Sequence, residues 1–178
     1  VRVVIIVTSD KCYENKEWIW GYREEEQLGG RDPYSASKAC AELVTSSYRR
    51  SFFENSNLDV GIATVRAGNV IGGGDWGQDR LVPDAVRAFQ CSKPLIVRNP
   101  FSVRPWQHVL EPLAGYLMLA ERLYDDEEKW AGAWNFGPSD ESVVTAASLC
   151  DMIISHWRIG GWQMASPQED FHEAYFLK

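Results

Sequence analysis

The stretch Val3-Val4-Ile5-Ile6-Val7-Thr8-Ser9-Asp10-Lys11 decides the fold, because it joins an unbroken apolar run to a cluster of polar side chains. The short run of β-branched residues predicts a buried strand. In an open α/β sheet, ligands bind outside the carboxyl ends of the strands. The hydroxyl, carboxylate and ammonium groups of residues 8–11 are therefore expected to face a ligand.

A second pattern, Tyr34-Ser35-Ala36-Ser37-Lys38, places a phenol and an ammonium four residues apart, on one face of a predicted helix. The ammonium there favours the phenolate and holds the ring for proton transfer. Asp32 is a suitable N-cap and Pro33 a suitable first helical residue, so Tyr34 falls in the first turn. Such a pair also arises by chance, but beside a polar strand end it indicates redox and proton chemistry on an alcohol.

The remaining pattern is typical of an α/β protein. Strands are predicted over residues 3–7, 60–66, 94–97 and 134–136, and helices over residues 33–53, 83–91, 111–124 and 145–157, the last with Thr145 as N-cap. This alternation predicts parallel βαβ units with right-handed crossovers. Residues 14–31 are charged and aromatic and are expected to form a loop over the site. Two helices carry apolar faces of helical period: Ala36, Ala39, Cys40, Leu43, Val44 and Phe52 in the first, and Leu113, Leu117, Ala120 and Leu123 in the third.

The composition limits the class of partner. With 178 residues, 45% of them hydrophobic, the chain can bury a sizeable core as one domain. A net charge of −7 argues against nucleic acid or an anionic membrane as the main partner, but allows a small anion held by a few arginines. Because no stretch is typical of a membrane span or a signal peptide, a cytoplasmic protein is expected.

The four cysteines give no sign of a metal site. Cys12, Cys40, Cys91 and Cys150 lie far apart in the sequence, without a C-x-x-C motif, so neither zinc nor another metal is predicted. Buried free thiols in a reducing compartment are the expected state.

A glycine-rich segment, residues 66–76, follows the second strand and includes Gly72-Gly73-Gly74. Its backbone amides could approach a phosphate closely, or the segment could be a plain turn, and the sequence leaves both open. It is not a dinucleotide fingerprint, since no G-x-G-x-x-G follows a strand. Asn69, at the end of the strand, is the better ligand candidate because its amide both donates and accepts.

A second polar cluster, residues 98–108, supplies candidates for holding an anion. Arg104 lies beside Pro105 and Trp106 and could bind a diphosphate with both arms of its guanidinium, with Arg80 as a second cation. The alternative is a surface arginine that packs on the indole. His108 is interpreted as structural with respect to acid–base chemistry, because Tyr34 and Lys38 already cover that role.

Together these blocks resemble the CDP-glucose 4,6-dehydratase family, within the extended short-chain dehydrogenases/reductases. The resemblance rests on Thr8-Ser9-Asp10-Lys11-Cys12-Tyr13, the Tyr34/Lys38 pair, the run from Arg66 to Trp76, and Arg104-Pro105-Trp106-Gln107-His108. It implies a Rossmann-type doubly wound parallel sheet that binds NAD, together with part of a smaller sugar-nucleotide domain. It also implies CDP-glucose as the substrate and a homo-oligomer, a dimer or a tetramer.

The resemblance assigns roles to single residues. Tyr34 would take the proton of the glucose 4-hydroxyl while hydride passes to NAD, and Ser9 would hydrogen-bond the 4-oxygen. Asp10 would protonate the departing 6-hydroxyl before hydride returns to C6. Lys11 stands where related dTDP-glucose dehydratases carry a glutamate, and would be either the base at C5 or an electrostatic stabiliser of the enolate. On the cofactor side would lie Thr8, Tyr34 and Lys38, and on the substrate side Asn69, Arg80, Arg104 and His108.

The chain departs from this family in lacking the glycine-rich first turn of the dinucleotide-binding domain. Residues 1–70 would be the second half of the Rossmann domain, and residues 71–178 mostly the substrate domain with returning Rossmann elements. The glycine-rich N-terminal half would be absent, as expected of a piece of a longer protein. Two other functions stay open: another NAD-dependent sugar-nucleotide epimerase or reductase, and a catalytically inactive fragment that acts as a binding module.

Overall fold

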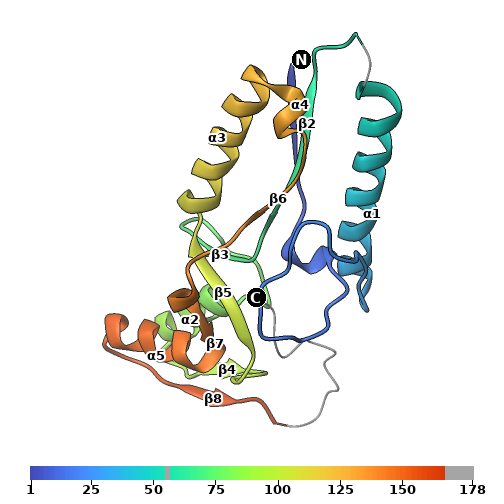
Figure 1. Cartoon of the computed structure of the whole chain (residues 1–178). Coiled ribbons are helices and arrows are strands. Elements are labelled where there is room, and N and C mark those ends of the chain that lie inside the picture. The colour runs from blue at the N-terminus through green and yellow to red at the C-terminus, as the bar shows by residue number, and fades with distance from the viewer. Residues whose placement is uncertain (55–56, 167–178) are drawn as a thin grey trace.

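The computed structural model describes residues 1–54 and 57–166 (Figure 1). Its central sheet consists of β1 (Val3–Val7), β2 (Gly61–Ala67) and β6 (Gly132–Phe136), in the order β1-β2-β6. All three strands are parallel, with Val3 opposite Gly61 and Val65 opposite Trp134. The α/β class and the parallel strands predicted from the sequence are confirmed, with strand ends shifted by two residues at most in this sheet.

Two helices cover opposite faces of this sheet (Figure 1). On one face α3 (Leu110–Asp125) packs Leu119 and Leu123 against Ala63 and Val65 of β2. On the other face α1 (Pro33–Tyr48) contacts the alternate residues of β2. The N-terminal end of α1 thereby lies at the carboxyl end of β1, where the polar residues 8–11 follow.

A second group of elements lies beyond the carboxyl ends of the central strands (Figure 1). One small sheet has the order β3 (Asn69–Ile71), β5 (Val103–His108), β7 (Val143–Thr145), and another pairs β4 (Leu95–Val97) with β8 (Trp162–Met164). Between them α2 (Leu81–Gln90) and α5 (Ala146–Trp157) enclose a separate core. Its buried members are Ala85, Phe89, Leu95, Val97, Ala146 and Cys150.

The remaining helical elements of the described residues are short. They are the 3-10 turns η1 (Asp10–Cys12) and η3 (Asp140–Ser142), the four-residue α4 (Glu127–Trp130), and the π-helical turn η2 (Arg49–Phe53). The helix predicted over residues 33–53 therefore ends as α-helix at Tyr48 and continues as η2. Thr145 caps α5 as predicted, because its hydroxyl accepts a hydrogen bond from the amide of Ser148.

The sequence did not predict β5, and it predicted only parallel pairing. A proline is unexpected in a central strand, since it cannot donate to a ladder and is normally confined to strand edges. In the structure β5 is nevertheless the central strand of its sheet, parallel to β3 and antiparallel to β7, with Pro105 opposite Val143.

The apolar faces of α1 and α3 correct a second expectation. Leu43, Val44 and Phe52, read as parts of one apolar face, are exposed, whereas the buried residues of α1 are Ser35, Ala39 and Glu42. Two of these three buried residues are polar, and Glu42 can be buried because it has an ionic partner on β2. Leu113 and Leu117 of α3 are likewise exposed, and only Leu123 of that predicted set is fully buried.

The expected burial of all four cysteines is wrong for two of them. Cys12 and Cys150 are buried free thiols, but Cys40 and Cys91 are exposed free thiols. Burial raises the pKa of the Cys12 thiol to about 12. Within the described ranges, no helix is both long and apolar enough to span a bilayer, and no group of His, Cys, Asp or Glu side chains could hold a metal ion.

Candidate active site

A cavity of about 670 Å³ opens where the central sheet meets the second group of elements. This volume lies within the range of small-molecule sites. The cavity is lined by most of the candidate site residues: Ser9, Asp10, Lys11, Tyr34, Asn69, Arg80 and Arg104. Thr8, Lys38 and His108 are not among its lining residues.

A single turn of 3-10 helix shapes the segment that follows β1. Ser9 caps this turn, because its hydroxyl accepts the amide of Lys11 at 3.2 Å and donates to Oδ1 of Asp10 at 3.0 Å. Thr8 is buried, and its hydroxyl donates to Glu42 of α1. Ser9, Asp10 and Lys11 therefore reach the cavity, while the hydroxyl of Thr8 is used inside the protein.

Asp10 is the carboxyl group that this environment changes most. The residue is half-buried, but its Oδ2 is sealed from solvent and has no hydrogen-bond partner among the described residues. Burial raises the pKa of Asp10 to about 6, although the Ser9 hydrogen bond and the charges of Lys11 and Arg104 oppose the shift. Asp10 thus keeps a proton at higher pH than an ordinary aspartate does, as a general acid requires.

The phenol and the ammonium lie on the first turns of α1, as predicted. Asp32 caps the helix, with its Oδ1 accepting the amide of Ser35 at 3.0 Å, and Pro33 is the first helical residue. Tyr34 is 51% exposed, and the Nζ atom of Lys38 lies 5.7 Å from the centroid of its ring. The pair therefore shares one helix face, from which Tyr34 lines the cavity.

The candidates for holding an anion occupy different environments. Arg104, on β5, is only 3% exposed, so the alternative of a surface arginine is wrong. Arg80 precedes α2, is well exposed, and forms an ion pair with Asp75 at 2.9 Å. His108 is exposed outside the cavity lining, where its Nδ1 accepts the amide of Leu110 at the start of α3.

The glycine run forms one wall of the cavity. Among its three residues, Gly74 has a positive φ of 80°, which favours glycine. A Cβ at Gly72 would lie 2.6 Å from a methyl group of Val109, whereas one at Gly73 would meet nothing within 4 Å. The run is therefore a turn with one left-handed residue and one closely packed residue.

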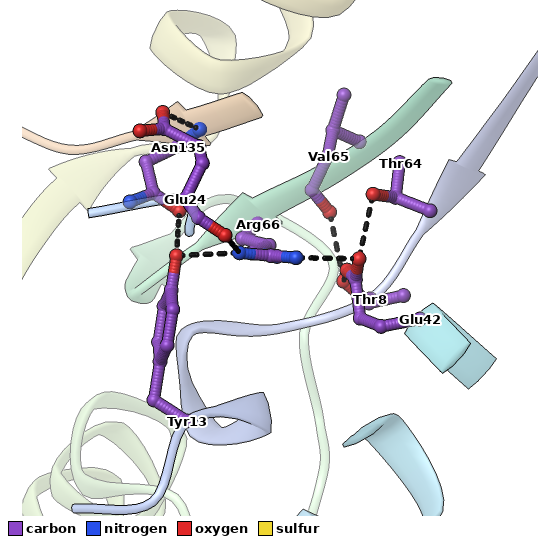
Figure 2. A network of polar contacts seen from close by, with 8 residues as sticks. All are labelled: Thr8, Tyr13, Glu24, Glu42, Thr64, Val65, Arg66 and Asn135. Carbon is purple, nitrogen blue, oxygen red and sulfur yellow. Dashed lines mark hydrogen bonds and ion pairs between the residues drawn. The ribbon is translucent and has the colours of Figure 1, made fainter. Parts of the chain in front are cut away.

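Sequence reasoning missed a buried polar network around Glu42 and Arg66, which are not among the residues that line the cavity (Figure 2). Glu42 and Arg66 form an ion pair at 2.7 Å, and their side chains are 3% and 4% exposed. Two signals could have revealed it: an arginine inside an otherwise apolar strand, and an acid four residues after Lys38 on the same helix face. Because each is costly to bury alone, the two residues together predict a pair.

Comparison with known proteins identifies a family and a relative with a similar sequence. Residues 1–137 match the NAD dependent epimerase/dehydratase family. The whole chain aligns at 52% identity with CDP-glucose 4,6-dehydratase of Salmonella typhimurium, covering 50% of that protein. The chain thus spans about half the length of this relative.

Solved structures share the fold at low sequence identity. The dTDP-glucose 4,6-dehydratase of Bacillus anthracis, in complex with NAD, superposes with a TM-score of 0.74 at 20% identity, over 97% of this chain and 51% of that one. The dTDP-glucose 4,6-dehydratase of Streptomyces venezuelae, with NAD bound, gives a TM-score of 0.77 at 19% identity, over 99% and 51%. Because residues 1–137 match its family model and the solved structures share the fold, the chain belongs to the NAD dependent epimerase/dehydratase family.

Proposed function

We propose that the intact protein is a CDP-glucose 4,6-dehydratase, an NAD-dependent hydro-lyase that forms CDP-4-keto-6-deoxyglucose. The observation that carries the proposal is Asp10, a buried carboxyl with a pKa of about 6 in the same cavity as Lys11 and Tyr34. Elimination of water needs an acid for the leaving hydroxyl, which epimerisation does not. The 52% identity to the Salmonella enzyme supports the same reaction and the same nucleotide.

The residues present fit NAD as the cofactor. Tyr34 and Lys38 bring a hydroxyl and an ammonium to one helix face at the carboxyl end of a parallel sheet, where they can bind ribose hydroxyls. The Thr8 hydroxyl is held by Glu42, so a cofactor contact of Thr8 stays a prediction and would have to use its backbone. NAD, when bound, supplies a hydride acceptor for C4 of the sugar and a hydride donor for C6.

The chain's own residues then move protons. Tyr34 takes the proton from the 4-hydroxyl through its phenol oxygen, and Ser9 donates a hydrogen bond to the 4-oxygen as it becomes a carbonyl. The new ketone makes the C5 hydrogen acidic. Lys11 removes that proton or stabilises the resulting enolate by its charge. Asp10 gives its proton to the 6-hydroxyl, which leaves as water while the electron pair of the enolate forms the C5–C6 double bond. Hydride addition at C6 would then leave an enolate, and a proton returned to C5 completes the 4-keto-6-deoxy sugar.

Two arginines and an amide would hold the nucleotide. Arg104, which is almost fully buried, and the exposed Arg80 both line the cavity, so both can contact a diphosphate there. Asn69, on β3 opposite Trp106 of β5, supplies a donor and an acceptor for the sugar or the base. A role for His108 in substrate binding stays a prediction.

Labelled substrate tests the proposal. The intact protein with NAD is incubated with CDP-glucose carrying deuterium at C4, and the product is analysed by NMR and mass spectrometry. A 4-keto-6-deoxy product with the deuterium at C6, and without net consumption of NAD, is expected. A C4 epimer would favour the epimerase alternative, a reduced sugar the reductase, and nucleotide binding without turnover the inactive binding module.

We also propose a cytoplasmic homo-oligomer, with residues 1–70 and 71–178 as its two functional parts. The exposed apolar side chains of Leu43, Val44, Tyr48 and Phe52 on and after α1 support self-association, since such a face is rarely left to solvent. Light scattering of the intact protein and of its Leu43→Lys variant measures this. An unchanged oligomer mass in the variant would contradict the use of this face.

A further inference from the structure

The buried polar network is centred on the carboxylate of Glu42 (Figure 2). Glu42 lies four residues after Lys38 and eight after Tyr34, so all three share one face of α1. It is 3% exposed and is not among the residues that line the cavity. Glu42 therefore does not contact a substrate in this cavity, but it lies on the helix face that carries the phenol and the ammonium.

The carboxylate of Glu42 joins three parts of the fold. It accepts hydrogen bonds from the hydroxyl of Thr8 at the end of β1, from Thr64 on β2 at 2.7 Å, and from Arg66 on β2 at 2.7 Å. Burial alone would raise the pKa of Glu42, but hydrogen bonds from Arg66, Thr8 and Thr64 outweigh it and hold the pKa below its ordinary value. Glu42 is thus ionised and fully paired at neutral pH.

Arg66 continues the network to the loop that follows the site. One of its terminal nitrogens donates to Glu42, and the other donates to the hydroxyl of Tyr13 at 2.7 Å and to the carbonyl of Glu24 at 3.0 Å. Tyr13 in turn donates to Asn135 at 2.7 Å. Because Tyr13 donates here, it must be neutral, in agreement with burial raising its pKa to about 12.

Asn135 fixes the loop from the other side. Its side-chain amide donates to the carbonyl of Tyr22 at 2.8 Å, and its backbone amide donates to the carboxylate of Glu24 at 2.8 Å. The ring of Tyr22 also stacks on Tyr13 with the centroids 4.9 Å apart. One continuous set of contacts therefore runs from α1 through β2 to β6 and residues 13–24.

We propose that the Glu42–Arg66 pair is a positioning element, which fixes the helix carrying Tyr34 and Lys38 against the segment carrying Ser9, Asp10 and Lys11. This role rests on the proposed dehydratase function and specifies how its two proton-handling groups are brought together. Thr8 provides the direct contact between Glu42 and that segment, since it immediately precedes Ser9. Thr64 and Arg66 attach the same carboxylate to the rigid central strand.

A positioning role explains the ion pair better than stability alone. Buried ion pairs often contribute no more stability than apolar side chains of the same size, but their geometry is specific. Here the fixed geometry links two segments that each hold one part of the chemistry. A displacement of about 1 Å between reacting groups can lower a rate by about 10²-fold.

Two matched variants, Thr8→Val and Thr64→Val, test the proposal in the intact protein with NAD. Each removes one buried hydroxyl that donates to Glu42, and each leaves the ion pair in place. We expect kcat for CDP-glucose to fall about 10- to 100-fold in Thr8→Val, with little change in KM, and to stay within about twofold of the wild type in Thr64→Val. The melting temperatures of the two variants should be similar, and Thr8→Ser should restore kcat.

Amide hydrogen exchange gives a second measurement that does not need turnover. Exchange in residues 9–12, where Lys11 and Cys12 donate to Ser9, should rise in Thr8→Val and not in Thr64→Val. In folded Glu42→Gln, amide exchange in residues 9–12 should be faster still. Should the wild type fail to turn over CDP-glucose, the proposed function is wrong, and the exchange data still decide the positioning role.

Several outcomes would overturn the proposal. Equal losses of kcat in both threonine variants, in proportion to lost thermal stability, would mean that the network only stabilises the fold. Loss of bound NAD from purified Thr8→Val would mean that Thr8 acts on the cofactor. Unchanged exchange in residues 9–12 would mean that Glu42 does not hold that segment.

Discussion

One oxygen atom accounts for the acid–base character of Asp10. Its Oδ1 accepts from Ser9, whereas its Oδ2 is enclosed without a partner among the described residues. Ionising the group therefore costs more than it does in water, because the negative charge is stabilised by fewer hydrogen bonds. A carboxyl of this kind stays protonated below about pH 6.

The pH dependence of turnover should report this group. Because the proposed general acid must be protonated, we expect kcat for elimination by the intact protein to fall as the pH rises through about 6. Asp10→Asn should abolish elimination over the whole range, and Asp125→Asn, at the exposed end of α3, should leave the profile unchanged. A group titrates within roughly a pH unit or two of its pKa, so the change should appear between about pH 5 and about pH 8. A wild-type profile that is flat over this range would contradict the proposed acid role of Asp10.

The loss of activity expected in Asp10→Asn should not result from unfolding. The pKa of Asp10 is above its ordinary value of 3.8 in the folded protein, so ionisation destabilises the fold at every pH above that value, and fully above about 6. Asparagine removes this cost, and we expect a gain of about 1–3 kcal/mol in the free energy of unfolding at pH 8. Urea unfolding at pH 8 and pH 4 measures the difference.

Lys11 can be assigned by separating the half-reactions. It is exposed in the cavity beside Asp10, and oxidation at C4 does not require it. If Lys11 is the base at C5, Lys11→Met should oxidise C4, stop there with reduced nicotinamide visible by its absorbance, and lose exchange of the C5 hydrogen with solvent. Slowed but measurable exchange would indicate electrostatic stabilisation of the enolate instead. Normal exchange would exclude both roles.

At the scale of elements, the junction between β2 and β3 positions Asp10. Gly68 lies there, and a Cβ on it would come 2.6 Å from Cγ of Pro105 on β5 and 3.1 Å from Oδ2 of Asp10. The close approach of two strands thus requires a residue without a side chain, and the same approach seals the Asp10 oxygen from water.

Gly68→Ala should therefore disturb both packing and the site. We expect a loss of about 1–3 kcal/mol in stability from overpacking, and a shifted midpoint in the pH profile of kcat because Asp10 is displaced. Gly73→Ala is the matched control for stability, since its new Cβ would meet nothing within 4 Å. Thermal unfolding of both variants measures the packing cost. Equal stabilities would show that the junction can relax.

At the scale of the whole molecule, the Glu42–Arg66 pair makes stability depend on acid. The pKa of Glu42 lies below its ordinary value of 4.5 in the folded protein. Its contribution to stability is therefore fully present above pH 4.5, and it is lost as the pH falls through the lowered folded value. The three elements that meet at this carboxylate should loosen together when it is protonated.

Glu42→Gln should lower the free energy of unfolding at pH 7 by about 3–5 kcal/mol, because it leaves Arg66 buried without its counter-ion. The variant should also show a flatter decline of stability below pH 4.5 than the wild type. Glu54→Gln, which removes an exposed partner of Arg49, should cost about 0–1 kcal/mol. Urea unfolding at pH 7 and below pH 4.5 measures these effects. Equal losses in the two variants would show that Arg66 does not depend on Glu42 as its counter-ion.

The sequence by itself determined the local features of this protein. The apolar run of β1 ends at polar residues, Asp32 and Pro33 start α1, and a spacing of four puts Tyr34 and Lys38 on one face. Each of these depends on neighbouring residues, so pattern and propensity suffice to predict it. The same patterns carried the resemblance on which the candidate site was based.

Only the tertiary structure decided which faces are buried and how the site is sealed. Periodicity located an apolar face on α1 but could not show that it stays exposed while Glu42 turns inward, because that choice depends on Arg66, a residue on another strand. The central position of β5 despite Pro105, and the enclosed oxygen of Asp10, likewise arise from segments far apart in the sequence. Burial, and with it charge stabilisation and proton affinity, depends on these long-range contacts.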